Sequence, residues 1–160
     1  MPDLLVNLLK LPVQESAPSE FVVRRAQPFE ISVVRRFVGE NFSANWADEI
    51  SVGFARQPVS VFVATRPGEQ TKERELIGFA AYECTRRGFF GPMGVVESAK
   101  NKGVGKALLL AALEALKEMG YVYAIVGAAG PVRFYQKTVG AIIIPGSEPG
   151  IYTDLLKSKQ

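Results

Sequence analysis

The stretch MGVVESAKNKGVGKALLLAALEALKEMG, which runs from Met93 to Gly120, decides the fold of this chain. It begins as a short apolar strand, continues as a basic loop that contains two glycines, and opens directly into a long apolar helix. The first N–H groups of a helix have no partner within it, and the helix dipole adds about half a positive charge at the same place. The pattern therefore predicts a phosphate-binding loop at the start of this helix.

Two common phosphate-binding motifs do not fit this loop. The P-loop requires Gly-x-x-x-x-Gly-Lys followed by Ser or Thr. Here Gly105 and Lys106 are followed by Ala107, so the hydroxyl group that would bind magnesium is missing, and Lys100 stands where the first glycine should be. The dinucleotide-binding fingerprint requires a glycine three residues after Gly105, where this chain has Leu108. Both motifs are therefore rejected.

A third motif fits the loop. The pattern Lys100-x-x-Gly103-x-Gly105 resembles the Arg/Gln-x-x-Gly-x-Gly/Ala motif of the GNAT superfamily, the acyl-CoA N-acyltransferases. In that family a strand that ends in Val precedes the motif by five residues, as Val95 does here. The resemblance implies that the chain binds acetyl-CoA as a cosubstrate. The residues expected to bind it are Met93, Val95, Lys100, Asn101, Lys102, Gly103, Val104, Gly105 and Lys106.

A second match lies about 30 residues further on. The segment Phe134-Tyr135-Gln136-Lys137, followed by Gly140, resembles the Phe-Tyr-x-Lys…Gly segment of acetyltransferases, although the spacing from Tyr to Gly is five residues instead of four. The resemblance implies that Tyr135 is the general acid that protonates the sulfur of CoA. A phenol with a pKa near 10 is protonated at pH 7 and can give a proton to a thiolate with a pKa near 8.5.

Composition sets the outer limits of function. The chain has 160 residues, which suits a single domain with its own core, and 48% hydrophobic and 22% charged residues are ordinary for a globular protein. The net charge of +3 is too mild to indicate nucleic-acid binding. One cysteine and no histidine argue against a disulfide framework, a His/Cys metal site and a His-based triad. No apolar run is long enough for a membrane span, and we expect a cytoplasmic enzyme without a metal.

The remaining patterns predict the order of elements. Residues 1–20 are expected to form an N-terminal extension, a short amphipathic helix with Leu4, Leu5 and Leu8 on one face followed by a linker from Gln14 to Glu20, and residues 21–160 a single acetyltransferase domain. Strands are expected at 21–26, 59–64, 76–83, 89–95 and 121–126, helices at 28–39, 45–50 and 106–119, and a closing hairpin at 142–144 and 151–156.

Together with the resemblance, this order implies an α/β (α+β) fold of the GNAT type. Helices flank a twisted, mostly antiparallel sheet, and a right-handed crossover through the helix 106–119 makes one central strand pair parallel. Pro92 lacks a ladder donor, so we expect a bulge that splays the strand 89–95 from its parallel neighbour. In the resembled family the pantetheine arm occupies this gap, and the two helices after the first strand line the acceptor site. Candidate acceptor contacts are therefore Asn41, Phe42, Asn45 and Trp46.

The expected reaction is direct attack of a neutral primary amine on the thioester, with the Val95 N–H holding the carbonyl oxygen and Tyr135 protonating the sulfur. The base is not identified by the sequence: Glu83 is one candidate, a water chain is another, and Glu97 is less favoured. The acceptor can be a small molecule or a peptide, and a homodimer is compatible with the pattern. The alternative is a non-catalytic module of the same fold that binds CoA or a partner protein.

Overall fold

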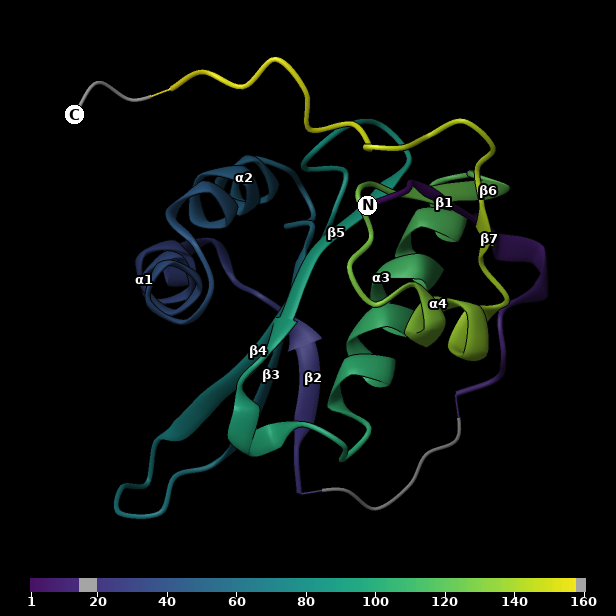
Figure 1. The fold of residues 1–160 in the computed structure, drawn as a ribbon. Coiled ribbons are helices and arrows are strands. Elements are labelled where there is room, and N and C mark those ends of the chain that lie inside the picture. Colours follow the sequence, from purple (N-terminus) through teal and green to yellow (C-terminus); the bar gives the residue numbers. More distant parts are fainter. Residues whose placement is uncertain (15–19, 158–160) are drawn as a thin grey trace.

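The computed structural model describes residues 1–14 and 20–157. The strands of the described part are Leu4–Asn7 (β1), Val22–Arg25 (β2), Val61–Pro67 (β3), Arg74–Tyr82 (β4), Phe89–Val95 (β5), Tyr123–Val126 (β6) and Ile142–Ile143 (β7). The α-helices are Ile31–Asn41 (α1), Ala44–Phe54 (α2), Val104–Glu118 (α3) and Val132–Val139 (α4), and 3-10 turns cover Leu8–Lys10 (η1), Pro28–Glu30 (η2) and Glu97–Ala99 (η3). The strands form one sheet in the order β2-β3-β4-β5-β6-β1-β7 (Figure 1).

The sheet is antiparallel except at its centre. β2, β3, β4 and β5 pair in sequence order as antiparallel neighbours, and β1 pairs antiparallel with both β6 and β7. β5 and β6 are parallel, because α3 carries the chain from the end of one back to the start of the other. The predicted fold class is confirmed.

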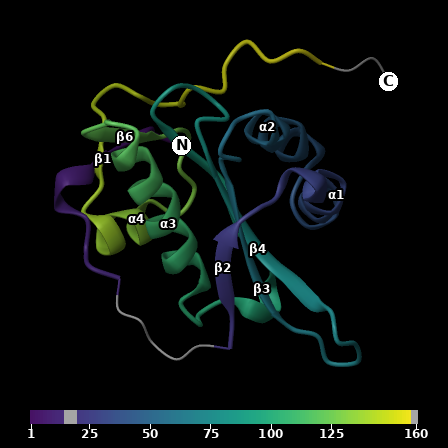
Figure 2. The ribbon, with the colours of Figure 1, turned by 180° about the vertical axis from the view of Figure 1, so that it is seen from behind.

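Helices cover both faces of the sheet. Figures 1 and 2 show α1 and α2 on one side and α3 and α4 on the other. The α3 side holds the larger core, in which Leu108, Leu109 and Leu113 are fully buried because α3 is apolar around most of its circumference. A second core lies under α1 and α2, where Ile50 packs near Phe79 of β4. α2 begins one residue before the expected start at 45, and Ser43 caps it by accepting the Trp46 N–H at 3.1 Å.

The N-terminal segment is a strand, so the predicted amphipathic helix is wrong. Leu4, Val6 and Leu8 are fully buried, whereas the residues between them are partly exposed, which is the alternation of a strand. β1 pairs with β6 along its whole length and holds β7 on its other side. Leu4 and Leu8 fit a helical face and a strand face equally well, and pairing with β6 selects the strand. The predicted linker from Gln14 to Glu20 lies for the most part outside the described residues.

The predicted closing hairpin is also wrong. β7 comprises Ile142 and Ile143, and residues 151–156 form no strand. Gly150 has φ +99°, a left-handed conformation that suits glycine and turns the chain away from the sheet. Ile151 then packs where Gly127 has no side chain, so closely that a Cβ on Gly127 would lie 2.9 Å from the Ile151 Cδ1. No helix within residues 1–14 and 20–157 is long and apolar enough to cross a membrane.

Candidate functional site

β5 and β6 separate soon after they meet. Their parallel pairing covers Phe89 with Ile125 and Phe90 with Val126, and the described part of the chain has no further rung between them. The separation coincides with a bulge in β5, because Ala80 of β4 pairs with Met93 while Tyr82 pairs with Phe90. The extra residue falls at Gly91-Pro92, so the bulge predicted near Pro92 is confirmed. We call the last parallel rung the fork and the space beside residues 91–95 the gap.

Beyond the fork, no described strand pairs with the main chain of β5 on the side of the gap. The Val96 N–H donates to the Ile77 carbonyl of the neighbouring strand at 2.9 Å, so this pair is a hydrogen-bonded one. Hydrogen-bonded and non-hydrogen-bonded pairs alternate along an antiparallel ladder. Val95 and Met93 therefore direct their N–H and C=O groups away from β4 and toward the gap. This edge can pair with an extended molecule.

The predicted phosphate-binding loop, residues Lys100 to Lys106, which we call the phosphate loop, ends in a helix start for which the described residues provide no side-chain cap. Gly103 is the N-cap residue of α3, and its φ of +85° is the left-handed conformation that glycine adopts at no steric cost. The first main-chain bond of the helix runs from the Ala107 N–H to the Gly103 carbonyl at 3.0 Å. The N–H groups of Val104, Gly105 and Lys106 precede this bond and lie where an anion would meet the positive end of the helix dipole.

The open space and the positive charges around the loop also suit an anionic ligand. A Cβ on Gly103 would meet no atom within 4 Å, and a Cβ on Gly105 would lie 3.9 Å from the Val95 Cγ2, so the loop and the gap adjoin. Lys100 pairs with Glu97 at 2.8 Å, with both side chains exposed. No ion pair is found for Lys102 or Lys106 among the described residues. These two lysines keep their charge available for a ligand.

Tyr135 lies at the fork, on the side of α3 and α4. Its ring meets that of Phe90 edge to face with 6.1 Å between centroids, and that of its neighbour Phe134 with 5.2 Å. The side chain is buried, and burial raises the pKa of Tyr135 to about 12. The phenol is therefore firmly protonated at neutral pH. Phe134 in turn would lie 3.7 Å from a Cβ on Gly105, so the loop, the gap and Tyr135 form one continuous site.

Glu83 lies apart from the gap. It follows β4 with φ +58°, and its N–H donates to the Phe89 carbonyl at 3.0 Å, which places it before the fork, where the strands are closed. Its buried carboxylate accepts the Gly88 N–H and lies 3.9 Å from the Arg56 guanidinium. These contacts hold the turn between β4 and β5 together. Glu97 is exposed beside Lys100 in the phosphate loop.

The four candidate acceptor contacts divide into two pairs. Phe42 packs on β5, since a Cβ on Gly94 would lie 2.5 Å from its ring, and Trp46 packs on Phe42 with 5.7 Å between ring centroids. Asn41 and Asn45 are exposed, and the Asn41 amide donates to the Phe37 carbonyl. Phe42 and Trp46 therefore form the wall behind β5 on the α1/α2 side.

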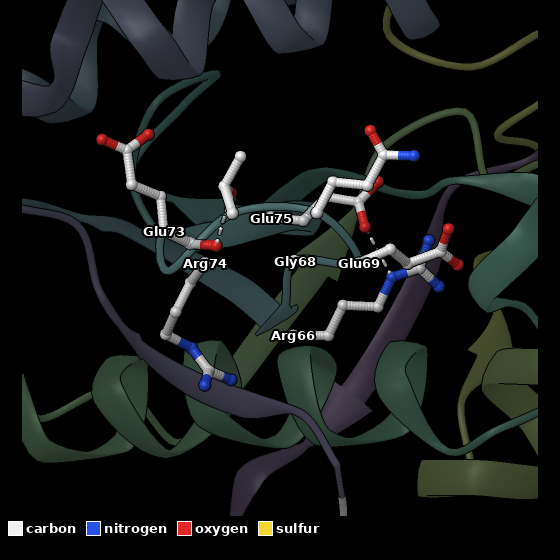
Figure 3. Close-up of a pocket in the computed structure, with 8 residues that line it drawn as sticks. Arg66, Gly68, Glu69, Glu73, Arg74 and Glu75 are labelled. Atoms are coloured by element: carbon white, nitrogen blue, oxygen red, sulfur yellow. Dashed lines mark hydrogen bonds and ion pairs between the residues drawn. The ribbon is translucent and has the colours of Figure 1, made fainter.

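Two hollows were not visible in the sequence. One, of about 470 Å³, lies at the tip of the β3–β4 hairpin and is lined by Arg66, Glu75 and other polar residues (Figure 3). Arg66 pairs there with Glu75 at 2.9 Å and reaches Ser98, in the turn before the phosphate loop, at 3.2 Å. The other, of about 340 Å³, lies beside α2 and contains Glu49. No local motif marks either hollow: the first is formed by residues 66–75 of one hairpin tip, and the second is assembled from separate segments.

The other reactive side chains do not suggest different chemistry. Cys84 is buried, and burial raises the pKa of its thiol to about 11, so it is a neutral thiol at pH 7. Within residues 1–14 and 20–157, no three His, Cys, Asp or Glu side chains are grouped to hold a metal ion.

Solved structures share this fold at low sequence identity. A glucosamine N-acetyltransferase region of a fungal multi-domain GH3 β-N-acetylglucosaminidase superposes with a TM-score of 0.71 at 18% identity over 89% of this chain and 19% of that one. A GCN5-related N-acetyltransferase from Sphaerobacter thermophilus gives 0.69 at 17% identity over 89% and 48%. A GNAT family N-acetyltransferase from Escherichia coli, solved with CoA, gives 0.53 at 20% identity over 78% and 71%. The chain thus spans about a fifth and about half of the first two proteins.

Comparison of the sequence with known proteins identifies a family but no individual relative. A search of curated proteins gives no significant match. The family model described as "Acetyltransferase (GNAT) family" matches residues 27–141, which include the gap, the phosphate loop and Tyr135. That match covers well over half of the chain, and the fold agrees with it. This protein belongs to the GNAT acetyltransferase family.

Proposed function

We propose that this protein is an N-acetyltransferase that transfers an acetyl group from acetyl-CoA to a primary amine by direct attack. The observation that carries the proposal is the continuity of an uncapped helix start with the free edge of β5. An anion and an extended, amide-bearing chain are the two ligands that these features suit, and CoA joins both in one molecule. Bound acetyl-CoA would supply an activated acyl group and a thiolate leaving group.

The residues present fit such a ligand. The N–H groups of Val104, Gly105 and Lys106 would hold the diphosphate, and Lys102 and Lys106 would add positive charge. The pantetheine arm would pair with the main chain of Met93 and Val95, much as a peptide adds a strand to a sheet edge. The glycines at 103 and 105 leave room for this approach. The E. coli relative solved with CoA and a Brucella melitensis relative solved with acetyl-CoA support this assignment.

Two N–H groups of β5 compete for the role of oxyanion donor. Val95 was expected from the sequence to hold the carbonyl oxygen, and its N–H is directed into the gap. However, Val95 adjoins Gly105 at the phosphate end, and Phe90, beside Tyr135, lies five residues away, or about 16 Å along a strand. We therefore assign the carbonyl oxygen to the Met93 N–H, two residues nearer the fork, and the pantetheine arm to Val95. A well-aligned donor of this kind is worth about 3 kcal/mol.

Tyr135 would act on the leaving sulfur as a strong hydrogen-bond donor. Because burial raises the pKa of Tyr135 to about 12, complete proton transfer to a thiolate with a pKa near 8.5 would cost about 5 kcal/mol. A hydrogen bond from the phenol stabilises the charge that develops on sulfur without that cost. The thiolate can then take its proton from solvent after the product leaves.

The proton of the attacking amine needs an acceptor, since an amine of the lysine type is only about 0.04% neutral at pH 7. β5 contains no carboxylate, and the carboxylate of Glu83 is engaged by Gly88 and Arg56 on the closed side of the fork. We therefore favour an ordered water in the gap over Glu83 as the acceptor of this proton.

The absence of a carboxylate in β5 is also the observation that favours the second candidate, a domain that binds CoA without catalysis. Two measurements separate the candidates. Calorimetry with CoA tests binding, and release of the CoA thiol over a panel of primary amines tests transfer. Binding with amine-dependent thiol release supports the enzyme, binding without release supports the second candidate, and no heat with any CoA derivative overturns both.

A further inference from the structure

The cavity beside α2 is the strongest unassigned feature of the molecule. Three separate segments line it: α2, the turn that follows β4, and the C-terminal segment after Gly150. Its volume of about 340 Å³ suits a small molecule. Its polar lining residues are Glu49, Thr85, Arg86, Tyr152 and Thr153.

The cavity adjoins the fork from the side opposite to Tyr135. Successive side chains of a strand point to opposite faces, so Phe89 points to the α2 side because Phe90 packs on Tyr135. Ile151, which lines the cavity, packs between these elements: a Cβ on Gly127 would lie 2.9 Å from Ile151 and 3.3 Å from Phe89. The cavity therefore lies at the closed end of the fork on the α2 face, so its occupant must extend past the fork to bring an amine into the gap, while the CoA sulfur leaves toward Tyr135 on the other face.

Glu49 presents a carboxylate with unused hydrogen-bonding capacity. Its Oε1 accepts from the Thr85 hydroxyl and, at 2.7 Å, from the Tyr152 hydroxyl. A carboxylate has about four acceptor positions, so two protein donors leave Oε2 available. Both donors fix the position of the carboxylate, since one comes from the turn after β4 and the other from the C-terminal segment.

Its carboxylate has no ion-pair partner in the described part of the chain. Arg86 lines the same cavity, but its guanidinium donates to the Thr85 carbonyl at 2.9 Å, and no ion pair joins it to Glu49. The adjacent carboxylate on α2, Asp48, is mostly exposed and pairs with Arg35 at 3.3 Å. A partly buried, unpaired carboxylate is costly unless a cation meets it. The Glu49 carboxylate therefore favours a cationic group in the cavity.

We propose that Glu49 binds a cationic group of the acceptor, and that the acceptor is a small molecule with a second ammonium or guanidinium group beside the amine that reacts. This inference rests on the proposed transfer to an amine. Glu49 is then a specificity-determining residue: it holds the far end of the acceptor in the cavity and directs the free amine to the gap. Tyr152 and Thr85 are positioning residues, because they act through the carboxylate.

The test compares a diamine with a monoamine of the same length. Thiol release is measured with putrescine and with butylamine for the wild type, for Glu49→Gln and for the matched control Asp48→Asn. Glutamine keeps an oxygen that can accept from Thr85 and Tyr152, so thermal unfolding should be nearly unchanged. We expect the wild type to show a KM for putrescine about tenfold or more below that for butylamine. This ratio corresponds to the free energy that a hydrogen bond to a charged group contributes. Glu49→Gln should lose this preference with little change in kcat, and Asp48→Asn should keep it.

A binding measurement makes the inference independent of turnover. Calorimetry with putrescine, in the presence of CoA, should give heat for the wild type and for Asp48→Asn, and binding about tenfold weaker or more for Glu49→Gln. Equal KM values for the two amines in the wild type, or an unchanged preference in Glu49→Gln, would overturn the inference and leave the transferase proposal standing. If neither amine is acetylated, the transferase proposal fails for these acceptors. Binding of putrescine that depends on Glu49 would then still support the cation site, and no binding would overturn it.

Discussion

The helix starts on the two faces of the sheet are built differently. On the α1/α2 side, side chains satisfy main-chain groups at the helix starts: the Glu30 carboxylate accepts the Gln27 N–H at 2.8 Å at η2, which leads into α1, and Ser43 caps α2. On the α3/α4 side, α3 begins at Gly103 and α4 at Pro131, and the described residues provide no side-chain cap for either. A side-chain cap is worth about 1 kcal/mol, so a missing cap costs stability. At α3, the missing cap leaves the helix start available to an anion.

Each face also carries a tyrosine with a raised pKa, for different reasons. Burial alone raises the pKa of Tyr135 to about 12 on the α3/α4 side. On the α2 side, partial burial and the hydrogen bond to the Glu49 carboxylate together raise the pKa of Tyr152 to about 12. One phenol is kept neutral by apolar burial and the other by partial burial together with an anion, so the two faces differ in polarity where they meet the fork.

The largest expected effect comes from giving α3 a cap of its own. Gly103→Asp and Gly103→Asn both introduce a capping residue that tolerates the left-handed conformation, at a position with open space. We expect Gly103→Asp to weaken CoA binding about 100-fold, because its carboxylate takes the place of the diphosphate and repels it. The neutral Gly103→Asn should lose about tenfold or less. Calorimetry with CoA measures both; equal losses would mean that charge at the helix start is not what binds CoA.

The next effect concerns Tyr135. Tyr135→Phe should lower kcat about 30-fold and leave the affinity for CoA unchanged, since only the hydrogen bond to the developing thiolate is lost. Tyr123→Phe, at an exposed position of β6, is the matched control and should have no effect on thiol release. Unchanged turnover in Tyr135→Phe would remove this residue from the mechanism.

A smaller effect separates the two tyrosines. Glu49→Gln should lower the pKa of Tyr152 toward its ordinary value near 10 and leave that of Tyr135 at about 12. For a phenol whose pKa is raised on folding, the associated stability is present below about pH 10 and is lost as the pH rises toward 12. Glu49→Gln should therefore lose less stability over this range than the wild type. Absorbance titration of tyrosinate, with Tyr152→Phe to assign the signal, measures the shift; a pKa for Tyr152 that does not move would refute the role of the carboxylate.

The smallest effect tests the capped side. Ser43→Ala should reduce the free energy of unfolding by about 1 kcal/mol and leave CoA binding unchanged. Ser32→Ala, at an exposed position of α1, serves as the control for the substitution itself. A loss of CoA affinity in Ser43→Ala would contradict the separation of the two faces.

The central part of the molecule was predictable because its signals are local. The loop glycines, the apolar strand before them and the helix after them are contiguous, and Pro92 marks its bulge by chemistry that does not depend on context. Fold class and family follow from this segment and from Tyr135, whose environment could not be predicted. The burial that raises its pKa comes from Phe90 in β5 as well as from its neighbour Phe134.

The two ends were mispredicted because their structure depends on distant partners. Leu4 and Leu8 satisfy both the helical and the strand periodicity, and only the pairing with β6 decides between them. Residues after Gly150 look like a strand, yet Ile151 finds its place against Gly127. Glu49 carried no signal at all, because its two donors, Thr85 and Tyr152, come from segments that only the fold brings to α2.

The position of β1 has a consequence for how the molecule is made. β1 leaves the ribosome long before β6 and β7, which are its neighbours in the sheet but lie far from it in the sequence. Contacts between segments that are far apart in the sequence form slowly, because a long loop must close, at a cost in entropy, before the contacts can form. Until then Leu4, Val6 and Leu8 face water, so a nascent chain halted before Tyr123 would expose this apolar row and depend on chaperones to stay in solution.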